Sequence, residues 1–423
     1  MSHGLQGTQA KITLSLECNN DCVFCYNRLR KDTGSQTIPF ERVLELIDEA
    51  VVSGADSLNF IGGEVTILPR FAEQIAYAGG RFTDISINTN GRRLSDEGFA
   101  RAVVKAGLTQ VDVSLHAARA STHDALSRAP GAWAETCEGL RHLRTLQGEG
   151  ARLSSSVTTL LLAETLPELD ALGDLLRELG VRSWRLKYAH GAFGCGSEND
   201  PNAYILRYSE VIPALRRALD RHDQALNISV HDIPLCLLGD LLLASTDDDD
   251  HEVAQYLEAG VEEARPVMGH WGETSARCDA CVAREACCKI SPAYLRRWGD
   301  KELQAFDESG YAAAVAQAER RRARSVSGSS ESPSKDAGDA ALARWRQTID
   351  QSAEAGDWTR VRRLARARLR QDPDDGNAQR SQRMAEMHLL NVEAEAAAEA
   401  GDPARARLLH ALIRRRYGEF SSD

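Results

Sequence analysis

Short apolar runs alternate with amphipathic stretches over roughly the first 190 residues of the chain. The β-type runs are Lys11–Leu16, Ser57–Ile61, Asp84–Asn88, Gln110–Leu115, Arg152–Leu161 and Ser183–Lys187. Between them lie segments such as Phe40–Val52, whose apolar residues recur with helical spacing. Six such units with parallel connections predict an α/β fold, either an open doubly wound sheet or a partial barrel. In both folds, functional groups gather on loops at the carboxyl ends of the strands.

The pattern changes beyond this region. Tyr204–Asp223 predicts a further helix, and the acidic run Asp247–Asp250 predicts a solvated loop. Ser325–Asp339 is rich in Ser, Gly and Pro, which is typical of a flexible linker. After it, the string at Glu354–Asp357 recurs at Glu399–Asp402, each time followed by an Arg-rich amphipathic stretch. This repeat predicts two helix–turn–helix hairpins, similar to tetratricopeptide hairpins but with a longer period.

Composition narrows the protein class. The 423 residues suffice for two or three domains, and no apolar run approaches the length of a membrane span. The N-terminus lacks the basic and apolar regions of a signal peptide, which predicts a cytoplasmic protein. A net charge of −11 argues against broad nucleic-acid binding. Ten cysteines in a reducing compartment indicate metal sites rather than disulfides.

The first cysteine group lies in the loop that leaves the first predicted strand. Cys18, Cys22 and Cys25 fall within eight residues. Three soft thiolates so close together suit iron–sulfur or zinc. A closed structural zinc site requires four ligands, and no fourth Cys or His lies nearby in the sequence. Three ligands leave one metal position open, where chemistry can occur.

The spacing of these cysteines, with Phe24 directly before the last, resembles the radical S-adenosylmethionine (SAM) signature. Gly62-Gly63-Glu64 follows the second strand and is similar to the "GGE" motif of that family, although Val65 replaces the usual Pro. Asn88–Gly91 follows the third strand and Ser114–His116 ends the fourth, in the order that the family has. The resemblance covers about residues 10–320 and implies a partial (β/α)6 barrel like a TIM barrel.

The resemblance also implies the cofactors. A [4Fe–4S] cluster would be held by Cys18, Cys22 and Cys25, and its fourth iron would be chelated by SAM. The residues that the resemblance assigns to SAM are Phe24, Gly62, Gly63, Glu64, Asn90, Ser114, His116 and Arg128. Glu64 would pair with the SAM ammonium, and Gly62 and Gly63 would let the backbone approach the ligand. Asn90 has the alternative of a turn residue, and His116 that of a loop cap.

The chemistry implied is reductive. One electron cleaves SAM to a 5′-deoxyadenosyl radical, which abstracts hydrogen from an unactivated carbon of the substrate. An electron donor such as flavodoxin or ferredoxin is implied as a partner.

A second cysteine group contains Cys278, Cys281, Cys287 and the adjacent Cys288, with Cys236 about forty residues earlier. Four sulfurs could close a structural zinc site. The arrangement also resembles the auxiliary cluster domain of SPASM and twitch enzymes. That resemblance favours a second iron–sulfur cluster on Cys236, Cys278, Cys281 and Cys287, with Cys288 as the rival for the last place.

These assignments predict four parts of the chain. They are a barrel at 1–225, a small auxiliary cluster domain at 226–323, a linker at 324–339 and an α-helical C-terminal domain at 340–423.

Other candidates concern the substrate. Cys195, after the sixth strand, is a candidate hydrogen or electron donor, with a plain loop thiol as the alternative. Arg185 and Lys187 alternate on that strand and could hold an acidic substrate group, whereas Cys137 is expected in the core. The leading substrate is a ribosomally made peptide or protein, including a carrier protein. The alternatives are a small metabolite, or a catalytically silent Fe–S or zinc scaffold that binds partners through its helical tail.

Overall fold

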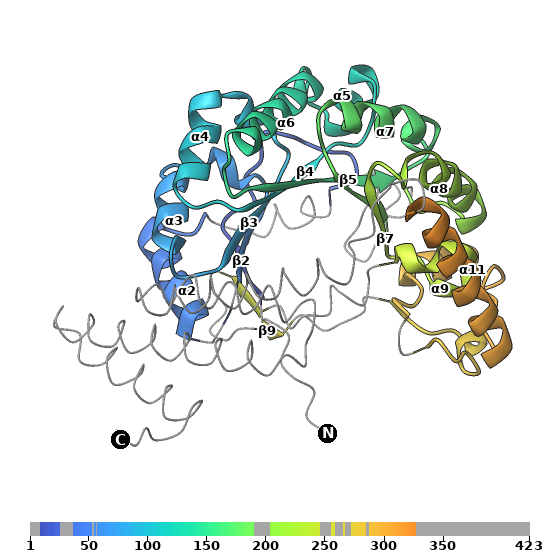
Figure 1. Ribbon diagram of the computed structural model, residues 1–423. Coiled ribbons are helices and arrows are strands. Elements are labelled where there is room, and N and C mark those ends of the chain that lie inside the picture. The colour runs from blue at the N-terminus through green and yellow to red at the C-terminus, as the bar shows by residue number, and fades with distance from the viewer. Residues whose placement is uncertain are drawn as a thin grey trace, which may run out of the picture. The chain divides into compact units, whose positions relative to one another are not determined.

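A parallel sheet with helices along one face forms the body of the first compact unit of the chain, residues 1–329 (Figure 1). The computed structural model describes residues 9–25, 37–52, 55, 57–189, 204–245, 255–258, 265–266, 272–284 and 287–326. The second unit, 330–423, lies outside them, as do the predicted helical hairpins, the acidic run and Cys195. The predicted domain boundaries therefore stay predictions. No helix in the described part is long and apolar enough to cross a bilayer.

The strands follow one another in chain order across the sheet. They are β1 (Gln9–Thr13), β2 (Ser57–Ile61), β3 (Asp84–Thr89), β4 (Gln110–Ser114), β5 (Ser154–Leu161), β6 (Ser183–Tyr188) and β7 (Asn227–His231). Each pairs in parallel with the next. Two short strands, β8 (Gln255–Glu258) and β9 (Arg265–Pro266), extend the β1 edge, β8 parallel to β1 and β9 antiparallel to β8. The six expected strands are all present, and β7 is an additional one just past the predicted barrel boundary at 225.

Helices connect the strands. They are α2 (Phe40–Val52), α3 (Phe71–Ala78), α4 (Glu97–Lys105), α5 (Ala120–Ser127), α6 (Ala132–Gly148), α7 (Leu169–Glu178) and α8 (Tyr208–His222). In Figure 1 they lie along the outer side of the curved sheet. Helix α2 has the bounds that its periodicity predicts, and it buries Val43, Leu46, Ile47 and Ala50. α8 begins four residues later than expected, at Tyr208.

The two faces of the sheet differ in polarity. The face that packs on the helices is apolar and buried, as at Phe60, Ile87, Val113, Leu186 and Val230. Alternate residues point to the opposite face because side chains in a strand alternate with a period of two. These alternate residues are polar and include Asn59, Asn88, Asp112, Thr158, Arg185, Lys187 and His231. Parallel sheets are usually apolar on both faces, so a polar second face indicates a surface that receives a polar ligand.

The four-cysteine region is the part of the chain from residue 235 to residue 326 without β8 and β9, and it carries the second cysteine group. It packs against the β7 edge of the sheet. It includes α9 (Leu235–Leu238), α10 (Pro292–Trp298) and α11 (Glu308–Val326). The ring of Tyr208 in α8 stacks on Tyr294 in α10 at 4.2 Å between centroids, and lies 4.8 Å from that of Tyr188, the last residue of β6. All three rings are buried, and such contacts add to the stability that area burial gives. The barrel and the four-cysteine region therefore share one core.

Candidate functional site

The cysteine loop follows β1 and has no regular secondary structure. The thiols of Cys18, Cys22 and Cys25 are partly buried. The backbone N–H of Asn20 donates to Cys18 Sγ over 3.4 Å, and that of Cys25 donates to the carbonyl of Cys22 over 3.1 Å. Burial, and then the neighbouring thiols of Cys25 and Cys18, raise the pKa of Cys22 to about 12. The loop thus brings three thiols within electrostatic range, and bound cations would be needed to hold them as thiolates.

The Gly62-Gly63-Glu64 segment holds the chain that enters this loop. Gly63 N–H donates to the carbonyl of Ser15 and Glu64 N–H to that of Glu17, both over 2.7 Å. A Cβ atom on Gly62 would lie 2.3 Å from the Ser15 carbonyl oxygen, and one on Gly63 would lie 2.1 Å from that of Glu17. The glycines are therefore needed for contact between two backbone segments. The sequence interpretation, that they admit a ligand, missed this packing reason.

The carboxylate of Glu64 accepts hydrogen bonds from several neighbouring residues. Its Oε1 accepts from the Thr66 N–H, the Thr66 hydroxyl and the Thr89 hydroxyl, at 2.6–3.0 Å, and its Oε2 accepts from the Asn90 N–H at 2.6 Å. The side chain is fully buried, and burial raises its pKa while these donors lower it. Glu64 thus ties its own loop to the carboxyl end of β3. A role in pairing with the SAM ammonium stays a prediction.

The carboxyl-terminal end of α5 holds the middle of the loop. Asp21 N–H donates to the Ser127 carbonyl over 3.0 Å, and Val23 N–H donates to the Leu126 carbonyl over 2.9 Å. Arg128 forms an ion pair with Asp21 at 3.3 Å. Its guanidinium therefore already has a partner in the cysteine loop, and its predicted contact with the SAM carboxylate is untested.

An apolar and aromatic group lies beside the last cysteine. Phe24 is buried with Leu126 and Leu162, and its ring meets the edge of the His116 ring at 4.7 Å. Burial lowers the pKa of His116 to about 3 and that of His123 to about 4. His116 Nδ1 accepts from the Leu160 N–H, which places the proton of the neutral ring on Nε2. Phe24 and His116 therefore form a dry, uncharged wall next to Cys25, and Ser114 ends β4 two residues before His116.

The second cysteine group lines a single pocket. Cys236, Cys278, Cys281 and Cys287 all face it, and Cys288 does not. Backbone N–H groups of Leu235 and Lys289 donate to Cys287 Sγ, and that of Phe306 donates to Cys281 Sγ, each over 3.4 Å. Cys288 is instead hydrogen-bonded to the carbonyl of its neighbour Lys289. Sequence spacing could not decide whether Cys287 or Cys288 is the last ligand. The backbone turns Cys287 toward the pocket and Cys288 away from it.

Both cysteine groups fit iron–sulfur clusters. N–H donors to cysteine sulfur are among the contacts that tune such clusters. Each cysteine of a cluster binds a different iron, so its sulfurs do not converge on one point. Among the described residues, no three Cys, His, Asp or Glu side chains are grouped to hold a single metal ion.

The polar face of the sheet carries a fixed charged pair. Asp112, 13% exposed at its side chain, accepts from Ser156 and Thr158 at 2.8–3.0 Å and pairs with Arg185 at 3.4 Å. The Arg185 side chain is 48% exposed. Lys187 pairs with Asp232 at 3.4 Å. Asp112 thus orients a guanidinium that is about half exposed.

Residues 12–176 match the family described as the Radical SAM superfamily. This segment matches a radical SAM domain. It contains the cysteine loop, the 62–64 segment and the ends of β3 and β4 in one continuous stretch. The cofactors of this family are SAM and a [4Fe–4S] cluster. The predicted partial-barrel fold is confirmed, and the predicted enzyme class and cofactors are those of the family that this segment matches.

Curated relatives share only part of the chain. It is 29% identical over 200 residues to a probable GTP 3′,8-cyclase of Methanocella arvoryzae, covering 45% of this chain and 61% of that protein. It is 31% identical over 157 residues to the mycofactocin maturase MftC of Mycobacterium ulcerans, covering 36% of this chain and 42% of that protein. The chain therefore spans less than two thirds of either relative.

The fold extends over a longer region than these sequence matches. The structure of anSMEcpe with bound AdoMet and Cp18Cys peptide superposes with a TM-score of 0.51 at 15% identity. That superposition covers 76% of this chain and 99% of that one, and it shows a shared fold.

Sequence reasoning missed the residues that support the radical SAM site. Thr66, Thr89 and Arg92 contact the motif residues through side chains, and Arg92 reaches across from another loop. Their only sequence signal is a position inside or next to a motif, because such contacts depend on how the strand ends are aligned.

We expect Gly63→Ala to weaken the first cysteine site. The added methyl group would lie 2.1 Å from the Glu17 carbonyl oxygen, so the backbones must separate, at a cost of about 1–3 kcal/mol. Iron and sulfide content after anaerobic reconstitution, with the thermal unfolding midpoint, measures this. Gly148→Ala in α6 is the control, because its Cβ meets no atom within 4 Å. Equal iron content in both variants would contradict the role of Gly63.

Proposed function

We propose that the chain reductively cleaves SAM and uses the resulting radical to remove hydrogen from an unactivated carbon of a peptide or protein. The observation that carries the first half is the position of three thiols at the carboxyl end of β1, on an irregular loop held by neighbouring loops, inside a radical SAM domain. Cys18, Cys22 and Cys25 would hold a [4Fe–4S] cluster with one iron open to SAM.

A cluster on Cys18, Cys22 and Cys25 would pass one electron, taken from an external reductant, to bound SAM, which would split into methionine and a radical able to take a hydrogen atom from the substrate. The chain's own residues position and shield these groups. The 62–64 segment and the carboxyl-terminal end of α5 fix the cysteine loop. Phe24, with the neutral His116 ring, excludes water beside Cys25. Holding the reactants close in a dry site is the main contribution of a protein to such chemistry.

The pocket of the second cysteine group supports an auxiliary cluster on Cys236, Cys278, Cys281 and Cys287. Three cationic residues, Arg277, Arg284 and Lys289, also line this pocket and would offset the charge of four thiolates. A cluster with all four positions filled by cysteine would exchange electrons with the substrate radical rather than bind substrate.

Two comparisons and one contact in this chain support a peptide or protein substrate. The MftC relative is named a maturase, and the fold is shared with a solved structure that contains a peptide. On this chain itself, Asp112 orients Arg185 on the polar face, and the partly exposed guanidinium suits a carboxylate group. The relative named a GTP cyclase favours the alternative, a small anionic metabolite.

Formation of 5′-deoxyadenosine tests the enzyme class. The reconstituted wild-type chain, reduced anaerobically with SAM, should form it, and replacement of Cys18, Cys22 and Cys25 by alanine should abolish it. Chromatography of quenched reactions measures the product. Formation at the wild-type rate in the triple variant would refute the proposal, and a wild-type chain that binds iron yet forms none would favour a silent scaffold.

Cys287→Ala and Cys288→Ala form a matched pair for the auxiliary cluster. The first should lose about four irons per chain, the content of one cubane cluster, and the second should lose none. Iron analysis with Mössbauer spectra measures both. An identical loss in the two variants would contradict the assignment of Cys287, and zinc at wild-type stoichiometry would replace the cluster by a structural zinc site.

The substrate class can be tested by what stimulates deoxyadenosine formation. We expect stimulation by a peptide fraction of cell extract, and we expect protease treatment of that fraction to abolish it. A chain ending at residue 329, the boundary of the first compact unit, should keep unstimulated SAM cleavage but lose this response if 330–423 docks the peptide. Stimulation by the protease-resistant, small-molecule fraction would favour the metabolite alternative.

A further inference from the structure

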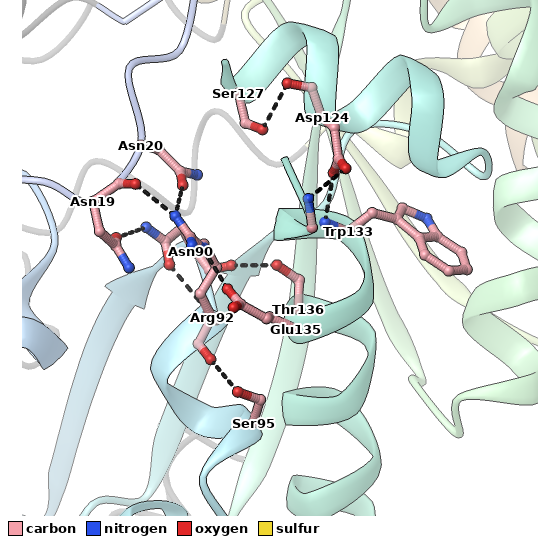
Figure 2. Close-up of polar contacts among 12 residues, drawn as sticks. Asn19, Asn20, Asn90, Arg92, Ser95, Asp124, Ser127, Trp133, Glu135 and Thr136 are labelled. Atoms are coloured by element: carbon pink, nitrogen blue, oxygen red, sulfur yellow. Dashed lines mark hydrogen bonds and ion pairs between the residues drawn. The ribbon is translucent and has the colours of Figure 1, made fainter. Parts of the chain in front are cut away.

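Arg92 bridges helix α6 and the cysteine loop. Its Nη1 donates to the Asn19 carbonyl over 2.5 Å and to Asn20 Oδ1 over 2.9 Å, and its Nε donates to Glu135 in α6 over 2.5 Å (Figure 2). The Arg92 side chain is only 17% exposed. Hydrogen bonds of this charged kind are shorter and stronger than neutral ones, and the planar guanidinium fixes direction as well as distance. Arg92 therefore sets the position of residues 19–20 relative to a helix.

Asn90 presents its amide nitrogen to the first cysteine. Its Nδ2 donates to Asn19 Oδ1 over 2.7 Å and lies 3.9 Å from Cys18 Sγ. Its Oδ1 accepts from the backbone N–H of Arg92 over 3.1 Å. This contact assigns the two ends of the carboxamide, because a backbone N–H requires the oxygen there. The N–H end must then face Cys18.

The backbone of Asn90 is also fixed. Its carbonyl accepts from the Thr136 hydroxyl in α6 over 2.8 Å, and its N–H donates to Glu64 over 2.6 Å. Figure 2 shows Asn90, Arg92, Glu135 and Thr136 as one network between α6 and the loop of Asn19 and Asn20. The Asn90 backbone is thus held at both its N–H and its carbonyl, which fixes the side chain that faces Cys18.

We propose that Arg92 and Asn90 are positioning residues for the first cluster, and that they act on its stability and its reduction potential. This inference rests on the proposed function. Arg92 holds the segment from Cys18 to Asn20 in the shape that binds iron, and its positive charge favours nearby thiolate. Asn90 donates an N–H to the Cys18 sulfur. Such donors withdraw electron density from the cluster and raise its potential, which makes reduction easier.

Arg92→Lys with Arg93→Lys as the matched control tests the first part. Lysine keeps the positive charge but cannot bridge Glu135 and the cysteine loop at the same time. The Arg93 guanidinium instead lies over the ring of Phe99 in α4, at 4.9 Å. Arg92→Lys should lose the SAM-sensitive iron to a chelator about tenfold faster, in the range known for supports of metal ligands. Arg93→Lys should match the wild type. Equal rates in all three chains would overturn the role of Arg92.

Asn90→Asp tests the second part. Aspartate keeps an oxygen for the Arg92 N–H, removes the donor to Cys18 and adds negative charge. The midpoint potential of the cluster signal that changes when SAM is added should shift to more negative values, with the circular dichroism spectrum unchanged. An unchanged or more positive potential would overturn the role of Asn90.

Glu135→Gln keeps the inference testable if Arg92→Lys does not fold. It weakens the bridge from the helix side and leaves both loop contacts of Arg92 in place. Faster iron loss than in the wild type would support the bridge, and wild-type loss would refute it. If the wild-type chain shows no cluster signal that responds to SAM, the proposed function itself fails. A normal wild-type signal with unaffected variants defeats only this inference.

Discussion

The pairing between the backbone at Ser15–Glu17 and the backbone at Gly62–Glu64 is the contact on which the site depends. Residues 18–25 form no helix or strand, so their shape must come from neighbours. Two backbone hydrogen bonds fix where the loop begins, and two more fix it against the carboxyl-terminal end of α5. Backbone contacts of this kind require glycine where the chains meet. A motif that looks like a ligand-binding turn is therefore also a packing element.

The sheet has one apolar face and one polar face. The apolar face supplies the core that holds the strands in register, and register determines which loop ends are neighbours. Because β1, β2 and β3 are adjacent, the cysteine loop, the 62–64 segment and Asn90 meet at one edge. The opposite face carries polar side chains such as Asp112 and Arg185.

The sequence was sufficient for the main elements and the motifs, and insufficient for their contacts. Strand β2 and helix α2 have the predicted bounds because their apolar spacing is strong and local. Strand β7 was missed because Asn227–His231 contains only two aliphatic residues in five, too few to stand out. The partners of Glu64 were missed for another reason: Thr89 is 25 residues away, and only the alignment of β2 with β3 brings it close. Adjacent Cys287 and Cys288 likewise differ only in which way the backbone turns them.

The stack of Tyr188, Tyr208 and Tyr294 has a kinetic consequence. Electron tunnelling slows exponentially as the gap between donor and acceptor widens. A hinge between the barrel and the four-cysteine region would make that gap fluctuate, and with it the rate. Three buried rings in contact resist such bending. With both clusters bound as proposed, their separation would therefore stay fixed, and electron transfer between them would not have to wait for a domain movement.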